Sequence, residues 1–147
     1  MNGIDSIDER TSGYGAFVLR VSLGTMFIAH ALLKVLVFTI PGTVGFFESL
    51  GLPAFLAYLT IAAEIGGGAL LILGVKTRLV TAALLPVLLG ALWVHSGNGW
   101  VFSAPNGGWE YPLFLAATSV AQILIGDGAF ALRPGPIGFR DHKAPAE

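Results

Sequence analysis

The chain has 147 residues and a net charge of −1; 54% of the residues are hydrophobic and only 12% are charged. A soluble domain of this size is about one quarter charged, so this composition excludes an ordinary soluble globular protein. The chain has no cysteine, which excludes thiol relays, disulfide exchange and iron–sulfur ligation. It also lacks the basic patch that nucleic-acid binding requires, and we expect no nucleic-acid partner.

The polar and acidic residues 1–13 show no features of a cleaved signal peptide and are expected to remain as a cytoplasmic segment. Four apolar runs then approach the ~20 residues that a membrane-spanning helix needs. These runs are 14–38, 53–75, 79–95 and 111–132. They predict an all-α integral membrane protein with one domain, 14–132, in which four transmembrane helices form an antiparallel bundle in the lipid bilayer.

The segments between these runs are short. Residues 40–53, IPGTVGFFESLGLP, are too few to span and predict a short interfacial helix between the first two spans. The connection GVKTRL at 74–79 makes the second and third spans antiparallel neighbours. The loop 96–112 is rich in glycine, asparagine and tryptophan, as at a membrane surface, and 133–147 is expected to be a cytoplasmic tail.

The basic residues predict the orientation of the chain. An even number of spans places both termini and the 74–79 connection on one side, which then carries seven of the eight lysines and arginines. These seven are Arg10, Arg20, Lys76, Arg78, Arg133, Arg140 and Lys143, and the other side has only Lys34. The positive-inside rule therefore predicts a bacterial inner-membrane protein with both termini in the cytoplasm.

Ionisable residues interrupt the first two spans. At ~100° per residue, Arg20, His30 and Lys34 lie within about 80° of one another on one helix face. Glu64 lies near the middle of the second span, where a carboxyl group must be neutral or paired. It is expected either to form a structural ion pair with Arg20 or Lys34, or to serve in a functional site. Such residues normally face a bundle interior, so we expect a polar pocket open to the periplasm with Glu64 at its floor.

Further polar residues are expected near this pocket. They are His95, Glu110, Tyr111 and Gln122. The glycines at 66–68 are expected to allow close packing between helices.

The order and spacing of these residues resemble the DoxX family over about residues 15–132. The resemblance rests on R-x3-G-x5-H-x3-K from Arg20 to Lys34, on FFESLGLP, on E-x-GG-x6-G-x2-TR from Glu64 to Arg78, and on EYPL from Glu110. The chain departs from the family in having Ala31 after the histidine, where glycine is usual. The resemblance implies a four-helix inner-membrane protein. The family is named for a subunit of a thiosulfate:quinone oxidoreductase, and its relatives are linked to membrane redox complexes.

The first functional hypothesis is a quinone-linked oxidoreductase component. In this hypothesis Glu64 and His30 are catalytic, and the quinone is bound by Arg20, Lys34, His95, Glu110, Tyr111 and Gln122. Phe27, Trp93 and Trp100 are candidates to line its ring, because a quinone site needs an apolar slot, hydrogen-bond donors and a proton route.

Two other hypotheses stay open. His30 and His95 lie at similar heights on different spans, so they are candidate axial ligands of a b-type haem; no other metal site is expected. Alternatively the chain is not an enzyme, but a small-molecule transporter or an assembly subunit of a larger membrane complex. A redox partner protein or a second copy of the chain is the expected protein partner.

Overall fold

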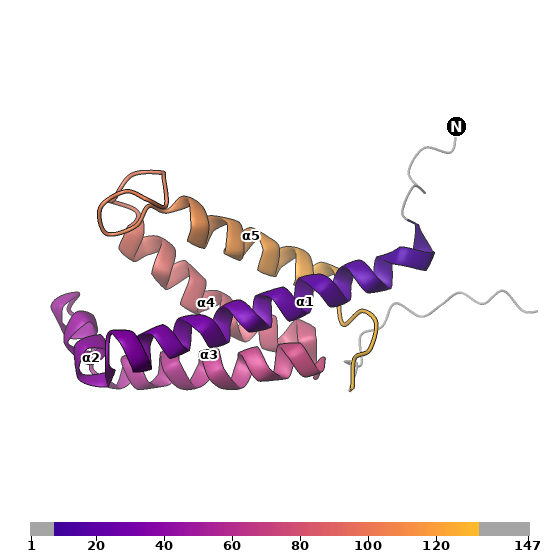
Figure 1. Ribbon diagram of the computed structural model, residues 1–147, viewed down its shortest axis with the longest axis horizontal. Helices are drawn as coiled ribbons and strands as arrows, with labels where there is room; N and C mark the ends of the chain where they lie inside the picture. Colours follow the sequence, from indigo (N-terminus) through magenta and orange to yellow (C-terminus); the bar gives the residue numbers. More distant parts are fainter. Residues whose placement is uncertain (1–7, 133–147) are drawn as a thin grey trace, which may run out of the picture.

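The computed structural model describes residues 8–132, and over that range the chain is helical with no strand. Figure 1 shows the helices, and their order is α1 (Glu9–Leu32), the π-helical turn η1 (Leu33–Val37), α2 (Ile40–Ser49), α3 (Phe55–Leu73), α4 (Thr77–His95) and α5 (Glu110–Ile125). Three stretches are long and apolar enough to cross a membrane, namely Arg10–Val37, Phe55–Leu73 and Thr77–His95. The all-helical membrane fold is thus confirmed. The shorter apolar α5, with 16 residues, leaves the fourth span a prediction.

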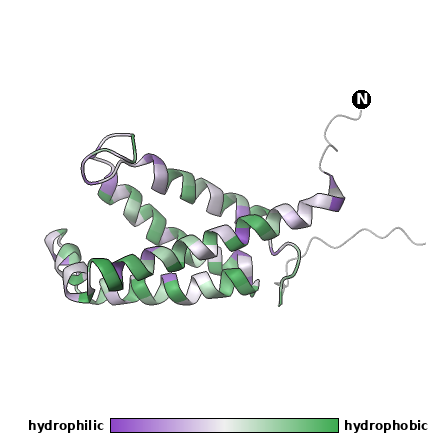
Figure 2. Ribbon diagram, in the orientation of Figure 1, coloured by the Kyte–Doolittle hydropathy of each residue, from purple (hydrophilic) through white to green (hydrophobic). Residues whose placement is uncertain are grey.

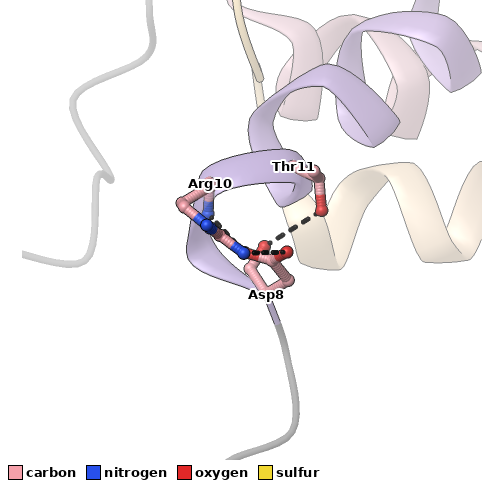
Figure 3. A network of polar contacts seen from close by, with 3 residues as sticks. All are labelled: Asp8, Arg10 and Thr11. Atoms are coloured by element: carbon pink, nitrogen blue, oxygen red, sulfur yellow. Dashed lines mark hydrogen bonds and ion pairs between the residues drawn. The ribbon is translucent and has the colours of Figure 1, made fainter.

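The first helix begins earlier than the predicted residue 14, because Asp8 caps it (Figure 3). The Asp8 carboxylate accepts a hydrogen bond from the Arg10 backbone N–H at 3.0 Å, and the Asp8 carbonyl accepts one from the Thr11 hydroxyl at 3.3 Å. An aspartate N-cap satisfies amide groups that the first helical turn leaves without partners. Part of the segment 1–13 is therefore helical, and residues 1–7 lie outside the described range.

The last helix ends earlier than the predicted residue 132. Gly126 ends α5 with a φ of 95°, a conformation that glycine adopts without steric cost. Residues 126–132 instead form a strap across the bundle: the Ala129 N–H bonds to the Gly13 carbonyl and the Leu132 N–H to the Leu73 carbonyl. The predicted tail, 133–147, with its three basic residues, lies outside the described residues.

Neighbouring helices pack in a closed order. α1 packs along α3, α3 against α4, α4 against α5, and α5 back against α1. Figure 1 shows the chain reversing direction at each connection, so α2 and the 96–109 loop lie at one end of the bundle. We call this the loop end. The start of α1, the 74–76 turn and the 126–132 strap lie at the other end, which we call the terminal end.

The distribution of side chains is that of a protein surrounded by lipid. Large apolar side chains point outward; Leu36, Phe114 and Leu124 are each about 70% exposed. Arg20, Glu64, Thr77, Thr81, Ser119 and Gln122 are buried instead. Figure 2 shows hydrophobic residues along most of each long helix. Ionisable residues in membrane proteins normally face the bundle interior, and this burial follows the same rule.

Glycines set the distance between the central helices. A Cβ atom on Gly24 of α1 would lie 2.6 Å from the Gly68 carbonyl oxygen, and one on Gly68 would lie 2.8 Å from the Gly24 carbonyl oxygen. A Cβ on Gly67 would lie 2.8 Å from the side chain of Leu84 on α4, whereas Gly66 faces open space. The predicted packing role is therefore confirmed for two glycines of the 66–68 triplet.

Candidate functional site

The ionised pair inside the bundle is formed by Lys34 and Glu64. The Lys34 Nζ atom lies 2.8 and 2.9 Å from the two Glu64 carboxylate oxygens. The Glu64 side chain is 4% exposed and that of Lys34 is 20% exposed. A buried carboxylate needs such a partner, and Lys34 is the partner that the sequence predicted for Glu64 as one of two candidates.

The contact between Gly24 and Gly68 explains why Lys34 is the partner. It sets the antiparallel register of α1 and α3, in which Lys34 lies about six residues, or ~9 Å, beyond the level of Glu64. Helical side chains lean toward the N-terminus of their own helix. In an antiparallel pair the two directions converge, and the long lysine side chain meets the carboxylate between the two levels.

His30 and Tyr111 extend this polar group toward α5. His30 Nδ1 donates to the Met26 carbonyl at 2.8 Å, so in the neutral ring Nε2 is the acceptor. The His30 and Tyr111 rings are stacked, with centroids 6.0 Å apart and planes at 22°. The Tyr111 hydroxyl donates to the Met26 sulfur at 3.3 Å. His30, four residues before Lys34 in the sequence, thereby contacts Tyr111 at the start of α5.

Tyr111 also borders an apolar pocket of about 490 Å³ at the loop end. The pocket is lined by Trp100, Phe102, Glu110, Tyr111, Leu113, Phe114 and Ala117. Its polar side is fixed, because the Glu110 carboxylate accepts a hydrogen bond from the Phe102 backbone N–H at 2.7 Å. The pocket is open, because Trp100, Phe102 and Phe114 each keep half or more of their surface exposed.

The structure does not place His95 in the same network as His30. His95 Nδ1 lies 3.0 Å from both the Asn106 and the Gly107 carbonyl oxygens, so the ring holds the 96–109 loop against the end of α4. Within residues 8–132 there is no group of three His, Asp or Glu side chains that could hold a metal ion.

Arg20 lies at the terminal end, ~21 Å along the helix from Lys34. Its guanidinium donates to the Leu71 and Ile72 carbonyls at 2.8 Å each and to the Ala129 carbonyl at 2.9 Å. The side chain is fully buried. Arg20 therefore satisfies carbonyls at the C-terminus of α3 and fastens the strap.

Gln122 is buried at the same end, where its amide nitrogen donates to the Gly126 carbonyl. The Asp127 carboxylate accepts from the Thr77 backbone N–H at 3.0 Å and caps α4. These bonds join the end of α5 to the start of α4, so Gln122, like Arg20, lies apart from the Glu64 group.

Of the proposed aromatic residues, Trp100 lines the pocket, whereas Phe27 belongs to the apolar core and Trp93 is 58% exposed. Sequence reasoning did not single out Met26 or Phe102. Met26 could have been found from its position four residues before His30, which places both on one helix face. Phe102 lies in an irregular loop, where no periodic pattern indicates it.

A helical bundle with an apolar exterior and a buried ion pair defines an integral membrane protein. The chain belongs to the DoxX family, whose family model matches residues 15–97. The Bacillus subtilis (strain 168) protein named "Putative oxidoreductase CatD" is 36% identical over 121 residues, which cover 82% of this chain and 85% of that relative. No solved structure matches the chain.

Proposed function

We propose that this protein is an inner-membrane, quinone-linked oxidoreductase component. The proposal is carried by the Lys34–Glu64 ion pair together with His30, one helical turn before Lys34, whose ring stacks on Tyr111 at the border of an aromatic pocket. Such a site combines a proton-holding carboxylate with an apolar slot, as quinone chemistry requires. The name of the Bacillus subtilis relative supports the redox class.

The proposed topology has α5 as a fourth span and α2 at the membrane surface. α5 rises ~24 Å, less than the ~30 Å hydrocarbon core, and a local thinning of the bilayer accommodates a short helix. Arg10, Lys76 and Arg78 all belong to the terminal end, which we assign to the cytoplasm by the positive-inside rule. The loop end, with the pocket, then faces the periplasm.

The residues of the pocket fit a quinone head group. Trp100, Phe102 and Phe114 offer apolar surfaces to a ring, and the Tyr111 hydroxyl would donate to a ring oxygen by giving up its weak bond to the Met26 sulfur. When bound, a quinone supplies two-electron, two-proton chemistry. In the proposal, Glu64 is the residue that holds or passes a proton, and His30, whose ring stacks on that of Tyr111, is the link between Glu64 and the pocket.

Tryptophan fluorescence tests binding directly. The purified protein in detergent is titrated with a short-chain benzoquinone, and quenching is compared among wild type, Trp100→Phe and Trp93→Phe. Trp100 lines the pocket and Trp93 lies on an exposed face of α4, so saturable quenching should survive Trp93→Phe and be reduced in Trp100→Phe, where Trp109, with its ring 4.5 Å from that of Trp100, still reports on the pocket. Linear quenching, equal for both tryptophans, would show only partition into the micelle and would favour transport or assembly instead.

A reduced-minus-oxidised spectrum of the purified protein separates the two cofactors. A change confined to the ultraviolet supports bound quinone. A Soret and an α band lost equally in His30→Ala and His95→Ala would replace the quinone proposal by a haem protein.

A further inference from the structure

Lys34 lies in a π-helical turn rather than in a regular α-helix. The Phe38 backbone N–H bonds to the Leu33 carbonyl, five residues back, at 2.9 Å. In an α-helix this N–H would bond to the Lys34 carbonyl instead. In the π turn, the Lys34 carbonyl therefore does not accept the hydrogen bond that the Phe38 N–H would donate to it in an α-helix. Turns of this kind occur mostly as single interruptions of α-helices, and often at functional sites.

Thr43 of α2 supplies the missing donor. Its hydroxyl donates to the Lys34 carbonyl at 2.9 Å, across the turn between the two helices. Thr43 is the buried residue of α2, with 4% of its surface exposed. The bond satisfies both the buried hydroxyl and the part-buried carbonyl, so the contact fixes the backbone at Lys34.

The junction that brings Thr43 to this place is strained. Thr39 has φ 64° and ψ 156°, a region of backbone conformation that is essentially restricted to glycine. Its hydroxyl accepts a hydrogen bond from the Gly42 N–H at 3.3 Å and caps α2. A β-branched residue keeps such a conformation only where surrounding contacts hold it. The bond from Thr43 to Lys34 is one of these contacts.

We propose that Thr43 is a positioning residue that holds Lys34 in place for its ion pair with Glu64. α2 packs against both η1, which carries Lys34, and α3, which carries Glu64. One short helix therefore contacts both sides of the ion pair, and the Thr43 hydroxyl is its hydrogen bond to the lysine backbone. The positioning of Lys34 by Thr43 does not depend on quinone binding. Its effect on the rate of quinone turnover rests on the proposed function.

Solid-state NMR measures the pair directly. The protein is labelled with ¹⁵Nζ-lysine and ¹³Cδ-glutamate in lipid bilayers, and the dipolar dephasing between the two labels is recorded. Among residues 8–132, Lys34 and Glu64 are the one lysine–glutamate ion pair. We expect wild type and Thr43→Ser to show the dephasing of a bonded pair, and Thr43→Val to lose it. Thr43→Ala replaces the valine variant if that variant does not fold.

Thr81→Val is the matched control. Thr81 is fully buried, and its hydroxyl donates at 2.7 Å to the Thr77 carbonyl of α4, a helix that carries neither residue of the ion pair. This control should keep the dephasing even if it lowers stability. Full dephasing in a folded variant without the Thr43 hydroxyl would overturn the proposal.

Function is measured separately. Quinone affinity, read from tryptophan quenching, should be unchanged in Thr43→Val while turnover falls. Absence of saturable quenching in wild type would refute the proposed function and leave the NMR result standing.

Discussion

Replacing Lys34 by methionine tests whether the ion pair holds the bundle together. The substitution removes the ammonium group and keeps an unbranched apolar side chain, so Glu64 is left buried without its partner. The matched variants are Glu64→Gln, which leaves Lys34 alone, and the double variant, which removes both charges. Lys76→Met is the control, because Lys76 is exposed at the terminal end.

The contact distance sets the scale of the effect. Unit charges 2.8 Å apart attract by about 6 kcal/mol at an effective dielectric constant of ~20, and desolvation offsets much of this. Breaking a buried pair costs about 3–5 kcal/mol, which we expect for Lys34→Met. Glu64→Gln should cost less, about 1–2 kcal/mol, because a carboxamide is cheaper to bury and the lysine can extend to the interface.

The double variant then reports the interaction between the two residues. We expect it to be about 2–3 kcal/mol more stable than the sum of the single losses predicts. Unfolding in mixed detergent micelles, followed by far-ultraviolet circular dichroism, gives each free energy. Lys76→Met should change it by less than about 0.5 kcal/mol. Single losses that simply add would refute the view that the two charges stabilise each other.

Three further substitutions test the packing and the backbone, each by the same unfolding measurement. Thr39→Gly should raise stability by about 1 kcal/mol, because relief of backbone strain exceeds the loss of the α2 cap. Thr39→Ala keeps the strained backbone, so an equal gain in that variant would argue against strain at Thr39. Gly24→Ala should cost about 1–3 kcal/mol, because its Cβ would meet the Gly68 carbonyl, whereas Gly66→Ala has open space and should be neutral. Arg20→Lys should cost about 2–3 kcal/mol, since one ammonium cannot replace a guanidinium bonded to three carbonyls. Unchanged quinone quenching in Arg20→Lys would agree with its position away from the pocket, and lost quenching in a folded protein would contradict it.

The sequence by itself determined the class of protein and the kind of group that needed explanation. Long apolar runs can only be helices in lipid, because each backbone polar group must be bonded within the chain. A carboxylate in such a run requires a partner, so Glu64 could be singled out without coordinates. Helix ends were harder to predict: the Asp8 cap and the glycine-rich strap at 126–132 act over a few residues only.

Only the tertiary structure decided which basic residue serves Glu64. The helical period predicted Arg20 and Lys34 on one face of the first span, so periodicity alone could not choose between them. The close approach of Gly24 and Gly68 sets the register of two antiparallel helices. In that register Arg20 meets the last carbonyls of α3, and Lys34 reaches back to the carboxylate. The choice depends on an interhelical contact between residues far apart in the chain, which no local pattern contains.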